Sequence, residues 1–134
     1  MDIEKLKEYA TRDNYFNFMG IMVLDISEGK AVVKLKIEER LTNFFDAGHG
    51  GAIYSLGDAG FQLACNASAD IESAVALSTT LNHIKKVEAG ETLFANAEVI
   101  ANTGRTSLTE ITIKNDQNEL IAVFRGLAYV KRVR

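Results

Sequence analysis

A glycine-containing loop followed by one long apolar segment constrains this fold more than any other feature of the sequence. Three glycines occur in the loop 43–51, and the eighteen residues from Ala52 to Ala69 contain no proline. Glycines permit close backbone approach and positive φ, so we expect a turn that ends near His49 and a helix after it. Small or apolar residues recur at a helical spacing, at Ile53, Leu56, Gly60, Leu63, Ala64 and Ala67. This spacing predicts one apolar helix face.

Asp58 interrupts the apolar run of this helix. A carboxylate is costly to bury without a partner, so Asp58 either faces solvent or is kept for chemistry. The first helical amides, at Gly50 and Gly51, have no acceptor within the helix and carry the positive end of its dipole. Glycine has no side chain that would block a ligand, and such a helix end can hold a developing oxyanion.

Asn43, His49-Gly50-Gly51 and Asp58 together resemble the motif of the hot-dog-fold acyl-CoA thioesterases, most closely the phenylacetic-acid-pathway (PaaI-like) branch. The resemblance extends from about Met19 to Tyr129. It implies an α+β hot-dog fold, in which an antiparallel sheet of about six strands wraps around one long central helix. It also implies that the substrates are acyl-thioesters of coenzyme A.

The composition is that of a soluble globular protein. A length of 134 residues predicts a single domain, residues 1–134. No apolar run approaches the length of a membrane span, and the charged N-terminus does not resemble a signal peptide. We therefore expect a cytoplasmic protein, and the single cysteine, which allows no internal disulfide, agrees with a reducing compartment. The net charge of −3 argues against nucleic acid as a partner. No cluster has metal-ligand spacing, so we expect no metal and no cofactor.

The rest of the sequence predicts a short helix and six strands. Asp2 suits the N-cap of a helix from Asp2 to Arg12. Alternating apolar residues between turn residues predict strands at 16–26, 31–38, 75–82, 93–101, 106–114 and 120–130. The last run is almost continuously apolar, which indicates burial on both faces. Asn102 and Gly104 suit a hairpin with positive φ. One helix cannot cover both sides of six strands, so the bare face or the edge strand must either pack against another chain or stay unusually apolar, and we expect an oligomer.

Helix geometry also argues for a dimer. Gly50 and Asp58 are separated by eight residues, or about 12 Å along a helix, whereas a base and an oxyanion donor must reach one reacting centre. A two-fold dimer with antiparallel central helices places Gly50 of one chain beside Asp58 of the other. We expect a homodimer at least, and the resemblance implies a homotetramer.

The resemblance also implies the roles of the site residues. The Gly50 amide, together with Asn43, would polarise the thioester carbonyl, while Asp58 acts as a general base or attacks the carbonyl directly. His49 would orient the loop or the acyl group, or it only packs the turn. Ser78 lies, with Thr79, on the strand where relatives place a hydroxyl that holds the water, so the resemblance implies this catalytic role for Ser78. The predicted substrate contacts are Gly51, Thr79, Lys85 and Arg105, of which the two cations would meet a coenzyme A phosphate or are simply solvated strand ends.

Other readings of the sequence are less favoured. Cys65 lies about 24 Å of helix from His49, so a core cysteine is expected rather than a nucleophile. His83 is interpreted as a satisfied structural histidine. A hot-dog hydratase needs an acid and a base placed together, and only Asp46 and His49 are close in sequence. A non-catalytic acyl-CoA-binding or regulatory module on the same fold is the main alternative.

Overall fold

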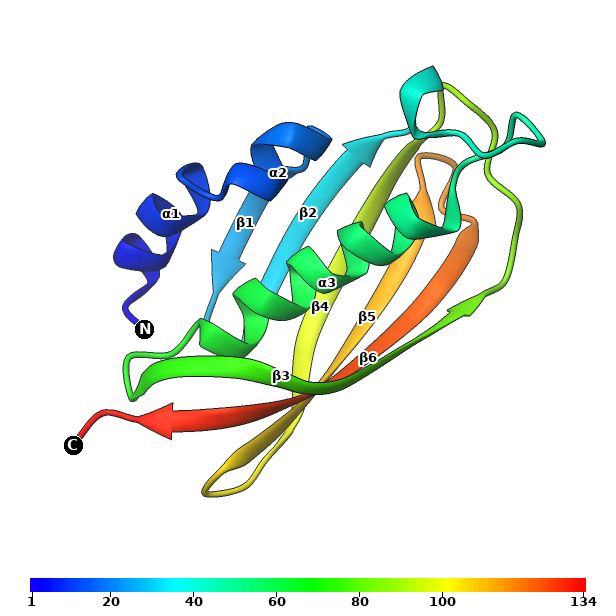
Figure 1. Ribbon diagram of the computed structural model, residues 1–134. Coiled ribbons are helices and arrows are strands. Elements are labelled where there is room, and N and C mark those ends of the chain that lie inside the picture. Colours follow the sequence, from blue (N-terminus) through cyan, green and yellow to red (C-terminus); the bar gives the residue numbers. More distant parts are fainter.

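One antiparallel sheet curves around a single long helix in the computed structural model, which describes residues 1–134 (Figure 1). The elements are α1 (Ile3–Thr11), α2 (Asn14–Met19), β1 (Met22–Ser27), β2 (Lys30–Lys36), η1 (Glu39–Leu41), α3 (Gly50–Asn66), β3 (Ile71–His83), β4 (Thr92–Asn102), β5 (Thr106–Asn115) and β6 (Leu120–Arg132). The strand order is β1-β2-β4-β5-β6-β3, and all neighbours are antiparallel. The predicted architecture of six strands around one long helix is therefore confirmed.

The apolar face of α3 forms the centre of the core. The turn before α3 ends at His49, as predicted, and all six residues of the predicted apolar face are buried. Two glycines allow the sheet to lie close to this helix. A Cβ on Gly57 would lie 2.7 Å from the Phe124 ring, and one on Gly126 would lie 2.6 Å from the Phe61 ring. The close approach of α3 to β6 therefore requires glycine at both positions.

The first predicted strand starts too early. Residues 14–19 form the short helix α2, because the Asp13 carboxylate caps it by accepting the amides of Tyr15 and Phe16, each at 3.0 Å. Gly20 ends this helix in the left-handed conformation, with φ at 83°. The strand itself begins only at Met22.

Positive φ angles do not fall where the sequence suggests. In the loop before α3 the left-handed residue is Asp46, with φ at 60°, and none of the three loop glycines has a positive φ. The β4–β5 hairpin also lacks positive φ, because Thr103 closes it with hydrogen bonds to Thr106. Gly48 instead serves close approach, since a Cβ there would lie 3.0 Å from the Val87 Cβ, while its amide donates to the Val87 carbonyl at 2.7 Å.

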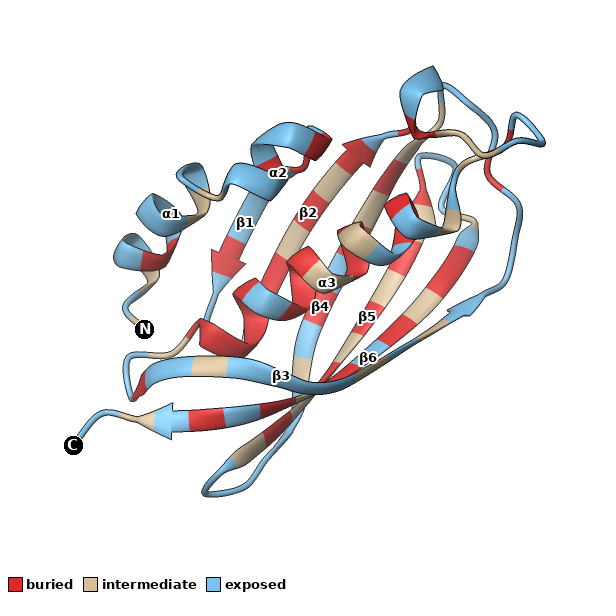
Figure 2. Ribbon diagram, viewed as in Figure 1, coloured by how far each residue is buried: buried red, intermediate tan, exposed pale blue.

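The last strand is buried on one face only within a single chain. Along β6, buried residues such as Phe124 and Ala128 alternate with exposed ones such as Arg125 and Tyr129. The reason is that α3 covers only one side of the sheet (Figure 2). The other face is left without a covering layer.

The outermost strand β3 is long and largely exposed (Figure 2). It pairs only with β6 and begins at Ile71, four residues before the predicted start of this strand at residue 75. Its register against β6 shifts between Ala76 and Ser78, which makes Leu77 the extra residue of a β-bulge. Val75 is 60% exposed and Leu77 is 58% exposed.

No helix of the chain has the combination of length and apolar character that a membrane span requires.

Candidate active site

The N-terminus of α3 presents one free backbone donor. His49 is the N-cap, and its Nδ1 accepts the Gly51 amide at 2.8 Å. The His49 carbonyl accepts the Ala52 amide at 3.0 Å. The Gly50 amide makes no hydrogen bond within the chain. Of the two amides predicted to contact a ligand, only that of Gly50 is therefore available. The ring of His49 caps the helix by binding the other amide, that of Gly51.

Asn43 shapes the loop that leads to this helix end. Its side-chain oxygen accepts the amides of Phe45 at 2.9 Å and Ala47 at 3.2 Å, which holds the loop in a tight turn. The Asn43 Nδ2 group donates to no atom of the chain. Asn43 and Gly50 line the same cavity, of about 350 Å³, so a free side-chain donor and a free backbone donor lie in one hollow.

Asp58 lies half-buried in a different hollow. This cavity, of about 300 Å³ between α3 and β3, is lined by Asp58, Phe61, Gln62, Cys65, Asn66, Ala74, Val75 and Ala76. Burial raises the pKa of Asp58, and the nearby Asp13 carboxylate raises it further. No hydrogen bond or ion pair within the chain engages the Asp58 carboxylate, so it is free to act on a ligand or on solvent. One chain alone does not bring Asp58 and Gly50 into the same cavity.

The two predicted hydroxyl residues of β3 point in different directions. The Thr79 hydroxyl pairs with the hydroxyl of Tyr54 on α3, whereas Ser78 is exposed and lines neither cavity. The predicted strict alternation from Val75 to Leu81 is wrong, because the bulge at Leu77 reverses which residues face the helix. Tyr54 was missed, although its spacing of four residues from both Gly50 and Asp58 is a readable signal.

The two predicted cationic contacts lie far apart. Lys85 lines the cavity at Gly50 and forms an ion pair with Glu119. Arg105 is in the hairpin between β4 and β5, at the opposite end of the sheet from the start of α3 (Figure 1). Within one chain, only Lys85 is therefore placed near the candidate site.

The prediction for Cys65 is confirmed, whereas that for His83 is wrong. Cys65 is 2% exposed, and burial raises the pKa of its thiol to about 12, so it is the expected core residue. The interpretation of His83 as a satisfied structural residue is wrong. Its side chain is exposed, has no hydrogen bond and lines the cavity at Gly50. No three His, Cys, Asp or Glu side chains converge in a way that could hold a metal ion.

Known proteins resemble this chain in both sequence and structure. Residues 47–122 match the family model described as the thioesterase superfamily. The acyl-coenzyme A thioesterase PaaI of Escherichia coli is 34% identical over 111 residues, which cover 83% of this chain and 78% of that protein. A putative esterase of Archaeoglobus fulgidus is 30% identical over 128 residues, covering 95% of this chain and 82% of that protein.

The structural comparison agrees. The solved structure of the E. coli PaaI protein from the phenylacetic acid degradation operon superimposes with a TM-score of 0.88 at 30% identity. This superposition covers 98% of the present chain and 94% of the other. A PaaI mutant structure from Thermus thermophilus gives a TM-score of 0.83 at 28% identity, covering 87% and 98% of the two chains.

Proposed function

This chain belongs to the thioesterase superfamily and has a PaaI-like hot-dog fold, and from this premise we propose that it hydrolyses acyl-coenzyme A thioesters at sites shared between two subunits. That it is a thioester hydrolase follows from the family. The substrate class is supported by its similarity to a protein named as an acyl-coenzyme A thioesterase.

The observation that carries the proposal is the separation of a free donor from an unpaired carboxylate on one helix. The Gly50 amide and the Asp58 carboxylate lie in separate cavities, about 12 Å apart along the axis of α3. Hydrolysis requires both groups within roughly 3 to 4 Å of one reacting centre. A two-fold axis between antiparallel copies of α3 brings Gly50 of one chain to Asp58 of the other, which makes two sites per dimer.

The edge of β3 supports the same two-fold axis. At Ala74 the hydrogen-bonding groups of the strand edge are already used by Asn66 on α3. The Asn66 side chain accepts the Ala74 amide at 2.8 Å and donates to the Ala74 carbonyl at 3.2 Å. The edge that remains for another chain is 75–83, whose midpoint is Thr79. The midpoint between Gly50 and Asp58 is Tyr54, and the Tyr54 hydroxyl pairs with Thr79. The midpoint between Gly50 and Asp58 on α3 and the midpoint of the free β3 edge therefore meet at the contact between Tyr54 and Thr79.

The proposed chemistry uses only water as co-reactant. The Gly50 amide and the Asn43 Nδ2 group of one chain donate to the thioester carbonyl oxygen, and Asp58 of the other chain takes a proton from water. The water oxygen bonds to the carbonyl carbon, and the carbonyl electron pair moves onto its oxygen. When that pair returns, the C–S bond breaks and the thiolate takes the proton from Asp58.

A covalent route remains open beside this one. The Asp58 carboxylate can attack the carbonyl carbon and release the thiolate, which leaves a mixed anhydride for water to hydrolyse. The acid, the thiol and the regenerated carboxylate are the same in both routes. In a single turnover in water enriched in oxygen-18, label in the Asp58 carboxylate demonstrates an anhydride whose aspartyl carbon water attacks, whereas label in the product acid alone shows that water added to the acyl carbon.

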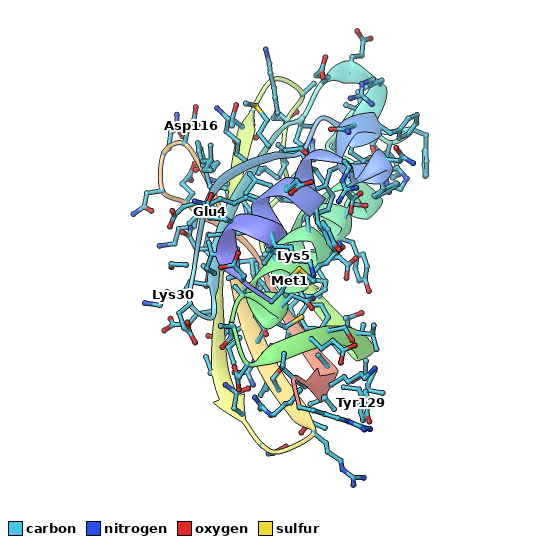
Figure 3. All side chains as sticks on the ribbon, turned by 90° about the vertical axis from the view of Figure 1, so that its left-hand side faces the viewer. Met1, Glu4, Lys5, Lys30, Asp116 and Tyr129 are labelled. Atoms are coloured by element: carbon cyan, nitrogen blue, oxygen red, sulfur yellow. The ribbon has the colours of Figure 1, made fainter.

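The first test is free-thiol release from short, long and aromatic acyl-CoA thioesters. We expect the wild type to turn over at least one of them and Asp58→Asn to lose at least about a hundredfold in kcat, as loss of a positioned base or nucleophile does. The matched control is Asp116→Asn, because Asp116 lies in the β5–β6 turn at the periphery of the molecule (Figure 3). Acyl-CoA binding without thiol release would instead support a binding module.

The assembly and the location are further parts of the proposal. We expect β3 edges to pair within the dimer and the sheet face that α3 leaves bare to join two dimers into a tetramer. Analytical ultracentrifugation measures the mass in solution, and a monomer at micromolar concentration contradicts a shared site. The expected location is the cytoplasm, with Lys85 and Arg105 as the expected contacts of coenzyme A phosphates.

A further inference from the structure

His83 reaches the start of α3 because of the bulge in β3. Beyond the extra residue Leu77, the side chains of Thr79, Leu81 and His83 face the helix: Thr79 pairs with Tyr54, and Leu81 packs against the core. Strands alternate sides with a period of two, so without the bulge these three side chains would face away from α3. The bulge therefore aims the last side chain of β3 at the helix N-terminus.

The imidazole of His83 lies against Gly50. Its Cε1 and Nε2 atoms are 3.3 Å and 3.4 Å from the position that a Cβ on Gly50 would occupy. An amide nitrogen lies about 2.5 Å from that position, so Nε2 is within about 6 Å of the Gly50 nitrogen. Two donors about 3 Å from one oxygen lie about 5 Å apart when they follow its lone pairs and at most about 6 Å apart, so the upper limit on the separation of Nε2 from the Gly50 nitrogen is compatible with one shared oxygen. A single ligand oxygen can thus contact both groups.

The ring nitrogens of His83 are free to bind a ligand. Neither ring nitrogen has a hydrogen-bond partner, and the side chain opens into the cavity that Asn43 and Gly50 also line. Glu88, the carboxylate nearest to His83 in sequence, pairs with Lys86 at 3.4 Å, and Glu119 pairs with Lys85. An imidazole that lines this cavity beside a free amide is therefore available to a ligand.

We propose that His83 is a catalytic residue of the thioesterase site, whose Nε2–H donates to the thioester carbonyl oxygen together with the Gly50 amide. The hydrogen stays on the nitrogen throughout. It stabilises the negative charge that the oxygen gains while water or Asp58 of the other chain adds to the carbonyl carbon. This inference rests on the proposed function and adds a donor from β3 to those from α3 and its loop.

The test compares two replacements of His83 in the thiol-release assay. His83→Phe keeps a ring of similar size and removes the donor, and we expect kcat to fall about ten- to a hundredfold with KM changed less than about threefold. His83→Gln keeps an N–H at similar reach, so we expect it to retain activity within about fivefold of the wild type. Asn82→Ala is the matched control, because Asn82 is the exposed neighbour on the opposite side of the strand.

The outcomes separate this inference from the proposed function. If the wild type releases no thiol from any thioester, the proposed function fails and the His83 role with it. If the wild type is active and Asp58→Asn is not, a normal kcat in His83→Phe overturns the His83 role alone. Equal losses in His83→Phe and His83→Gln also overturn it, because the ring then only packs. Should thermal unfolding reveal a misfolded His83→Phe, His83→Leu takes its place.

Discussion

Replacing Tyr54 by cysteine should link two chains covalently across the proposed two-fold axis. Tyr54 is four residues from Gly50 and four from Asp58, so any axis that brings those two residues together between chains passes beside it. Tyr54 is 38% exposed, and its hydroxyl reaches Thr79 near the middle of the free β3 edge. A cysteine at position 54 would therefore face its own copy.

The geometry sets how selective the link must be. A disulfide requires Cα atoms about 4 to 7 Å apart. The two copies of residue 54 have no offset along the helix axis, whereas Gln62 lies eight residues from the axis in each chain. Its two copies are then sixteen residues apart, or about 24 Å, which no disulfide spans. Gln62→Cys is thus the matched control on the same helix, exposed but out of register.

The assay is mild oxidation followed by non-reducing electrophoresis, with Cys65→Ala in every variant as background. We expect most of the Tyr54→Cys chain to migrate as a covalent dimer that reductant reverses, and Gln62→Cys to remain monomeric on the gel. A short bismaleimide should give the same contrast. Linkage through residue 62 but not 54, in a protein that ultracentrifugation shows to be dimeric, would refute the antiparallel register and with it the shared site.

Three further predictions concern the stability of the folded chain. Burial raises the pKa of Asp58 above its value in the unfolded chain, so the folded state loses stability as pH rises through and above the usual carboxyl range. Asp58→Asn should therefore raise the melting temperature at neutral pH, and this gain should vanish in acid. Gly126→Ala should lower the free energy of unfolding by about 1 to 3 kcal/mol in urea titration, because its Cβ would press on Phe61, and adding Phe61→Leu should recover part of the loss. Asn66→Ala should cost about 1 to 3 kcal/mol, since the Ala74 amide loses its partner, and hydrogen exchange at Ala74 should accelerate.

Local pattern was enough to predict the central helix and the positions of most strands. The buried face of α3 follows directly from residue spacing, and the helix start follows from the glycines after His49. These features depend on residues within a few turns of each other, which is why one sequence suffices. The resemblance added the fold and the thioesterase family, and both are confirmed.

The candidate site was only partly readable in the same way. Asp58 and Gly50 both lie on α3, as predicted. Asp58 is half-buried, and the Gly50 amide has no partner in the chain. The sequence could not reveal that Arg105 lies at the far end of the sheet from Gly50, nor that His49 takes the Gly51 amide. Such facts depend on where distant segments meet, and periodicity within a segment carries no information about that.

The bulge at Leu77 is the clearest case of what tertiary structure alone decided. Residues at every second position from Val75 to Leu81, all apolar except Thr79, predict one continuous face, yet pairing with β6 absorbs one extra residue and reverses the side chains beyond it. That reversal places Thr79 on Tyr54 and His83 on Gly50. Sequence determined which residues can form a strand beside a helix. Register between strands, which depends on the partner strand as much as on the strand itself, decided which of them face the candidate site.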